Sequence, residues 1–223
     1  MRPFSTAIGS LVLGAMLVSA PAGAQGLDLR PDLTQRDFEQ FAANLASTLR
    51  FRQLGDATPL GRGHVDLGVV SASTRAFPRI LARFGVTDHV DVGAWGGVDR
   101  DLSYGIAGID TTIALMTQGA ASPVTVSVRP NFTALIDSGL WAGTLGIDLS
   151  ISHAFGSVSP YAGIGATTSG AVEQSNRVDL DPVSAGHSLA FAGLSYRWRT
   201  IVLSAEVEKA QAVSYAFRIG KRF

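Results

Sequence analysis

Apolar and polar residues alternate along most of this chain, in stretches separated by clusters of Gly, Pro, Asp and Ser. Successive side chains of a β-strand point to opposite faces, so each stretch predicts a strand with one apolar and one polar face. In the clearest example Leu145 and Leu149 share one face and Asp148 lies on the other. This pattern predicts ten strands, at residues 60–71, 76–86, 89–98, 103–116, 123–135, 140–154, 159–169, 187–198, 200–208 and 212–223.

Two folds are compatible with this alternation, because the pattern does not say which face meets water. The apolar faces form the core of a soluble β-sandwich, whereas they face lipid in a transmembrane β-barrel. The mean hydropathy is +0.24, yet no apolar run after residue 26 is long enough for a helix that crosses a bilayer. High hydropathy without such a helix favours an all-β fold, an antiparallel up-and-down transmembrane barrel of about ten strands, with eight or twelve as alternatives.

Residues 1–24 predict a secretory signal peptide. Arg2 supplies a positive charge, residues 8–18 are apolar, and Ala22-Gly23-Ala24 matches a cleavage site that leaves Gln25 as the first mature residue. The alternative is an N-terminal membrane anchor, for which the apolar stretch is short. The chain has no cysteine, which excludes a disulfide framework, a thiol nucleophile and lipid attachment through an N-terminal cysteine.

The last strand has an apolar face that includes Tyr215 and Phe217 and ends in the aromatic Phe223. This ending resembles the C-terminal recognition strand of bacterial outer-membrane β-barrel proteins. Segments 144–152 and 160–165 also resemble strands of the small porin-like and OmpA-like members of that class. The resemblance implies location in the outer membrane, with outer-membrane lipid and the barrel assembly machinery as partners. It also implies that Tyr215, Phe217 and Phe223 form the assembly signal.

The direction of the strands orients this barrel. If Phe223 lies at the periplasmic end, the turns near residues 88, 119, 156 and 199 are periplasmic, and the connections near 74, 100, 138, 168–185 and 210 are outside. The longest connection then lies outside, as is typical of these barrels. Seven aromatic residues fall near the two expected membrane interfaces: Phe84, Trp141, Phe155, Tyr196, Trp198, Tyr215 and Phe223.

The polar faces of the predicted strands carry charges of both signs. Arg or Lys on the lipid face at mid-bilayer costs about 2–4 kcal/mol, so the charges are predicted to line the lumen. They are Asp66, Arg79, Arg83, Asp91, Asp110, Arg129, Asp148, Glu206, Glu208 and Arg218. They either form an ion-pair network that fills a narrow interior or line a path for a small solute. The favoured function is therefore a narrow porin-like channel or a structural surface barrel.

A helix is predicted before the barrel, within a periplasmic segment at 25–59 that precedes the barrel at 60–223. Over residues 33–50 the apolar residues Phe38, Phe41, Ala42, Leu45 and Leu49 recur with helical spacing. Thr34 is the predicted N-cap, and Asp37 lies in the first turn. Because the helix precedes the first strand, we expect it to cap the periplasmic mouth. The alternatives are that it plugs the barrel or lies on the inner leaflet with Phe38, Phe41 and Leu45 buried.

The sequence gives little support to an enzyme or to a protein that binds nucleic acid, a cofactor or a metal. The net charge of zero gives no reason to expect a nucleic-acid partner, and no cofactor or metal motif is present. A lipid-modifying enzyme of the outer leaflet is one alternative, with His187 and Ser188 as candidates. Adjacent strand residues point to opposite faces, which is poor geometry for a base and its nucleophile, so we expect no enzyme. The other alternative is a soluble periplasmic β-sandwich that binds a ligand.

Overall fold

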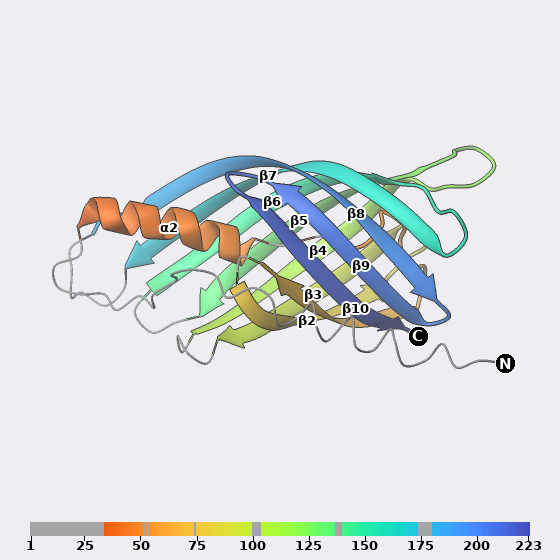
Figure 1. The fold of residues 1–223 in the computed structure, drawn as a ribbon, viewed down its shortest axis with the longest axis horizontal. Helices are drawn as coiled ribbons and strands as arrows, with labels where there is room; N and C mark the ends of the chain where they lie inside the picture. The colour runs from red at the N-terminus through yellow and green to blue at the C-terminus, as the bar shows by residue number, and fades with distance from the viewer. Residues whose placement is uncertain are drawn as a thin grey trace.

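The computed structural model describes residues 34–50, 52, 54–73, 75–99, 104–136, 140–173 and 180–223. Within these ranges the chain forms one helix followed by ten strands (Figure 1). They are α2 (Gln35–Leu49), β1 (Val65–Ala72), β2 (Arg75–Gly85), β3 (Val90–Asp99), β4 (Tyr104–Met116), β5 (Thr125–Ile136), β6 (Leu140–Ser152), β7 (Val158–Glu173), β8 (Val183–Trp198), β9 (Ile201–Lys209) and β10 (Val213–Arg222).

The ten strands form one closed antiparallel barrel. Each strand pairs with its neighbours in the sequence, and β1 pairs with β10 to close the sheet (Figure 1). The closing register runs from Asp66 opposite Arg222 to Ala72 opposite Ala216. The predicted all-β barrel of about ten strands is confirmed. The alternatives of eight strands, twelve strands and a β-sandwich are wrong, because the closed sheet uses all ten strands and surrounds a single interior.

The observed strands differ from the predicted ranges at two main places. The first strand begins at Val65, because the preceding residues bend inward and the backbone N–H of Leu60 donates to the Asp91 carboxylate. Strands β7 and β8 are longer than predicted, since their ladder continues as far as Ala171 opposite Val183. The longest expected outer connection therefore shrinks to residues 174–182, little longer than 117–124 at the other end. Connection length thus orients the barrel less strongly than the sequence indicated.

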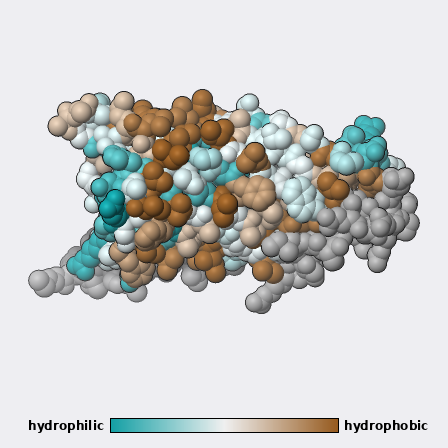
Figure 2. Space-filling view, turned by 180° about the vertical axis from the view of Figure 1, so that it is seen from behind, coloured by the Kyte–Doolittle hydropathy of each residue, from teal (hydrophilic) through white to brown (hydrophobic). Residues whose placement is uncertain are grey.

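The outer face of the barrel is apolar on every strand, and Figure 2 shows hydrophobic residues gathered over one side of it. Ile80 is 69% exposed and Leu145 is 64% exposed, although both are aliphatic. Soluble monomers rarely expose contiguous apolar patches larger than a few hundred Å². An apolar wall of this extent needs lipid around it, so the inside and outside faces lie as a transmembrane barrel requires.

Within the described ranges, no helix has both the length and the apolar character needed to cross a membrane.

Helix α2 begins after Thr34, the predicted N-cap. The Thr34 hydroxyl accepts from the backbone N–H of Asp37 at 3.3 Å, and the Thr34 backbone N–H donates to the Asp37 carboxylate at 3.3 Å. This reciprocal pair is a capping box. The hydrogen bonds from Thr34 also hold the pKa of Asp37 below its ordinary value. On the apolar side of the helix, Phe38, Ala42 and Leu49 are buried.

The expected position of α2 is wrong. The helix contacts β5, β6, β7 and β8 and packs its buried residues near Leu140 and Ala171, at the mouth opposite the one where β1 begins (Figure 1). It reaches that mouth because the described residues that follow it, 50, 52 and 54–60, run through the barrel interior. We call these residues the luminal segment. Helix α2 and the luminal segment therefore plug the barrel rather than capping it. The helical period of the sequence identifies the apolar face of the helix, but it does not show at which end of the barrel that face packs.

Candidate functional site

The barrel lumen is the candidate functional site. All ten charged side chains that alternation assigned to the lumen lie inside the barrel, and each is at most 7% exposed. Burying a charge is costly unless a partner compensates it. The pairing of these ten residues therefore decides whether the lumen is a filled core or a polar path.

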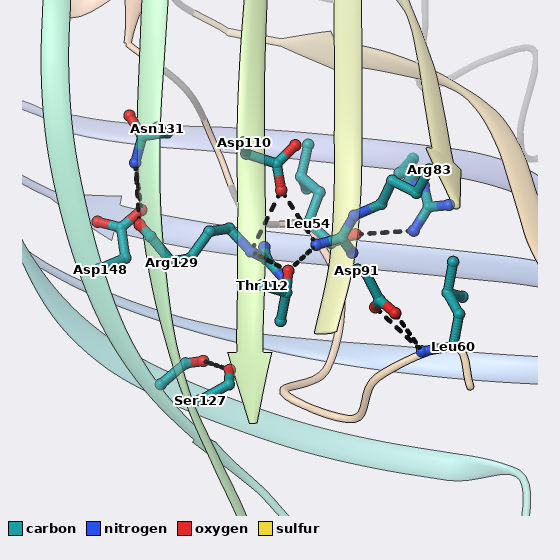
Figure 3. A network of polar contacts seen from close by, with 12 residues as sticks. Leu54, Leu60, Arg83, Asp91, Asp110, Thr112, Ser127, Arg129, Asn131 and Asp148 are labelled. Carbon is teal, nitrogen blue, oxygen red and sulfur yellow. Dashed lines mark hydrogen bonds and ion pairs between the residues drawn. The ribbon is translucent and has the colours of Figure 1, made fainter. Parts of the chain in front are cut away.

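One group of these charges joins β2, β4 and β5 of the wall (Figure 3). Arg83 of β2 lies 3.2 Å from Asp110 of β4, and the Nε of Arg129 of β5 lies 3.6 Å from the same carboxylate oxygen. Both arginines also donate to the hydroxyl of Thr112, from Arg129 at 2.8 Å. This group links three strands by charge-assisted hydrogen bonds. Thr112 could not be predicted as a member of this group, because a hydroxyl on a polar strand face carries no signal of its own.

A second group closes the barrel seam. Asp66 of β1 pairs with Arg218 of β10, and Arg222 of β10 lies 3.1 Å from the other oxygen of the same carboxylate. These contacts join the first strand to the last one, near the mouth that contains Phe223. Together with the first group they show that part of the lumen serves as a structural ion-pair network.

The remaining wall charges hold the luminal segment. Arg50 lies 3.3 Å from Asp148 of β6 and also pairs with Glu208 of β9. The guanidinium of Arg52 donates to the Ser214 hydroxyl of β10 at 2.8 Å. Both arginines are buried. Because they precede the predicted barrel in an irregular stretch, no periodic pattern marked them as lumen residues.

The wall also binds the main chain of the luminal segment. The backbone N–H groups of Leu54, Ala57 and Leu60 donate to Glu206, Ser152 and Asp91 respectively, at 3.0–3.2 Å. In the opposite sense, Arg79 donates to the Arg50 carbonyl at 3.4 Å and Arg218 donates to the Leu54 carbonyl at 3.3 Å. Side chains from β2, β3, β6, β9 and β10 thus surround the segment.

Leu54 has an unusual backbone conformation within the luminal segment. Its backbone has a φ of 41°, in the left-handed region that costs a non-glycine residue about 1 kcal/mol or more. The side chain is fully buried and packs with Ala72 and Ala216 of the wall. The wall therefore holds this residue firmly enough to offset its backbone strain.

Charge balance connects the segment to the wall. Among the ten predicted lumen residues, four are arginines and six are carboxylates, and Arg222 adds a fifth arginine to the wall. Arg50 and Arg52 bring the number of arginines to seven, and Asp56 of the segment brings the number of carboxylates to seven. The wall alone thus has an excess of acid, and the luminal segment compensates it. The signal that could have revealed this role is the unequal count of acids and bases on the predicted inner faces.

Apolar contacts fill the lumen toward the mouth that holds α2. Phe38 and Leu49 pack in one cluster with Leu81, Trp95 and Leu135 of the wall. The guanidinium of Arg79 lies 4.9 Å from the centre of the Trp95 ring, at the boundary between the polar and apolar parts. The lumen thus has two zones, a charged one around residues 50–60 and an apolar one around the helix.

The aromatic residues that were assigned to the membrane interfaces all lie exposed on the barrel exterior or its rim, between 42% and 65%. Phe84, Phe155, Tyr196, Trp198 and Phe223 lie toward the mouth where the last strand ends, and Trp141 and Tyr215 lie toward the other mouth. Tyr215 and Phe217, which the resemblance assigns to the assembly signal, point outward on β10.

His187 and Ser188 point to opposite faces of β8. His187 is half-buried on the inner face of β8, where its Nδ1 lies 3.1 Å from Nε2 of Gln211, and Ser188 is exposed on the outer face. A groove of about 580 Å³ on the outer wall is bordered by both residues and by Leu145 and Ala166. Among the described residues, no three His, Asp or Glu side chains are grouped to hold a metal ion.

No protein-family model matches the chain, and no curated protein sequence matches it. Similar solved structures include LpxR from Salmonella typhimurium, with 8% identity and a TM-score of 0.43 over 76% of this chain and 77% of that one. The KdgM porin has 10% identity and a TM-score of 0.36 over 72% and 98%. The N-terminal β-barrel domain of Pseudomonas aeruginosa OprF has 11% identity and a TM-score of 0.34 over 73% and 99%.

The identities and TM-scores of these matches are too low to assign a protein class, so the class is assigned from the architecture of the barrel itself. A closed antiparallel barrel with an even number of strands, an apolar exterior and a charged interior is the architecture of outer-membrane β-barrel proteins.

Proposed function

We propose that this protein is a narrow channel of the bacterial outer membrane, closed by its own luminal segment. The observation that carries the proposal is that the segment is held mainly by polar and ionic contacts to the wall. A displaced segment leaves behind a charged surface that water can hydrate, and such a surface suits the passage of small polar solutes.

The size of the barrel supports this function. Side chains alone fill the interior of a barrel of about eight strands. Ten strands enclose more space, and here the extra space contains residues 50–60 and part of α2. A purely structural barrel needs no inserted segment with its own charges, because two wall groups already pair among themselves.

Ionic contacts give the closed state a finite stability. Removing one partner of a buried ion pair costs about 3–5 kcal/mol, because the remaining charge lacks compensation. The double variant Arg50→Ala, Arg52→Ala leaves Asp148, Glu206 and Glu208 without the segment's charges. These carboxylates regain solvation only if water enters the lumen, so the variant favours the open state.

Single-channel recording in planar bilayers tests the proposal. A stability loss of about 3 kcal/mol predicts a rise of about 100-fold in the ratio of open to closed channels for the double variant. Arg36→Ala is the matched control, because Arg36 is exposed on α2 and should leave the ratio unchanged. Equal, negligible conductance of the wild type and the double variant would show that the barrel is structural and not a channel.

A further inference from the structure

We infer that the lumen is a binding site for arginine-bearing peptides, which the luminal segment occupies as a built-in ligand. The inference rests on the proposed function, since an outside peptide enters only when the segment has withdrawn. It goes further by naming the chemistry that the open lumen selects.

The wall recognises the main chain of the segment. Three backbone N–H groups and two backbone carbonyls of the segment are bound by wall side chains. Every peptide carries these groups, whatever its sequence. The wall side chains involved stand on strands of the closed barrel, so the same donors and acceptors are available to another peptide that follows the same path.

The wall also recognises the Arg50 side chain of the segment. Asp148 and Glu208, from β6 and β9, contact the two terminal nitrogens of the Arg50 guanidinium. The fork of a guanidinium presents several donors to carboxylates, which the single ammonium of lysine does not match. Both carboxylates are buried when Arg50 is in place, so a guanidinium that replaces Arg50 forms the same contacts shielded from solvent.

The vacated lumen keeps an excess of acid. Six carboxylates then face five arginines on the wall, the four predicted ones and Arg222. An anionic peptide is repelled by this excess, and a neutral one leaves it uncompensated. A peptide that carries two arginines separated by one residue and a single carboxylate, as the luminal segment does with Arg50, Arg52 and Asp56, restores the balance.

The test uses two synthetic peptides and the folded full-length double variant Arg50→Ala, Arg52→Ala. One peptide has the sequence of residues 50–60, and in the other both arginines are alanine. We expect the arginine peptide to bind at least about tenfold more tightly in fluorescence anisotropy, as one lost charged contact implies. It should also block the channels of the variant in the bilayer. The single variant Arg50→Ala, which disturbs the lumen less, serves for the same measurement if the double variant does not fold.

Wall substitutions locate the binding. In the double-variant background, Glu208→Gln should reduce the preference for the arginine peptide, whereas Asp88→Asn, in the exposed turn between β2 and β3, should leave it intact. Equal binding of both peptides, or a preference that Glu208→Gln leaves undiminished, overturns the inference. Conductance without preferential binding contradicts the peptide site and leaves the channel standing. Preferential binding without conductance contradicts the channel alone, and the absence of both contradicts both.

Discussion

Inside the barrel, glycine repeatedly stands beside a large side chain of a neighbouring strand. A Cβ atom on Gly163 of β7 would lie 2.3 Å from Phe191 and 2.4 Å from the backbone oxygen of Leu149. A Cβ on Gly193 of β8 would lie 2.3 Å from Tyr161, whose hydroxyl binds Glu206. These glycines make room for the aromatic side chains that fill the lumen, which is a packing role rather than a need for unusual backbone angles.

Gly163→Ala should therefore destabilise the barrel. Its new methyl group meets backbone as well as the Phe191 ring, and overpacking of this kind costs about 1–3 kcal/mol. Urea unfolding in lipid vesicles measures the loss as a lower transition midpoint. Gly186→Ala on β8 is the control, because nothing lies within 4 Å of its added Cβ. Identical midpoints for the two variants would mean that the wall adjusts without cost and that the packing argument fails.

At the scale of elements, the strands and the luminal segment differ in how far sequence reveals them. Every residue of a strand contributes to the alternation, so ten strands and the inward side of Arg129 or Asp148 could be predicted. Helix α2 and its N-cap at Thr34 could also be predicted from local signals. The position of the helix could not be predicted, because it depends on the apolar cluster at the mouth. We call this cluster the apolar ring; it is formed by residues far apart in sequence, such as Leu81 and Leu140. The position of Arg50 in the lumen could not be predicted, because its segment has neither the alternation of a strand nor the spacing of a helix.

Docking of α2 depends on Phe38, which is fully buried in this apolar ring. Truncation of a buried Phe to Ala costs about 3–5 kcal/mol, so Phe38→Ala should make the helix leave the mouth far more often. Limited trypsin digestion of the folded barrel measures this as faster cleavage after Arg36. Glu39→Ala, at the exposed neighbouring position, should be cleaved at the wild-type rate. If Phe38→Ala were equally resistant, the apolar ring would not be what retains the helix.

The whole molecule has two different ends, and the path of the chain connects them. Phe223 and the turn containing Asp88 lie at one mouth, whereas α2 and the hairpin containing Gln211 lie at the other. Lengths of the connections distinguish these ends weakly. The resemblance of β10 to an outer-membrane recognition strand predicts that the Phe223 mouth faces the periplasm and that the other mouth faces the outside of the cell.

Site-directed cysteine labelling tests this orientation, and the cysteine-free chain provides a background without label. A maleimide that does not cross the outer membrane should label Gln211→Cys in intact cells, and Asp88→Cys only after permeabilisation. The opposite pattern would mean a barrel inserted the other way, and equal labelling of both in intact cells would contradict location in the outer membrane.

Arg36→Cys extends the same measurement to the plug. A segment that stayed in the periplasm, as expected for a helix that simply precedes the first strand, would place position 36 beside Asp88 and protect it in intact cells. A chain that passes through the lumen places it beside Gln211 instead, because Gln35 exchanges hydrogen bonds with Asp181 in the connection between β7 and β8. Labelling of Arg36→Cys from outside, together with protection of Asp88→Cys, is therefore expected only if residues 50–60 cross the barrel.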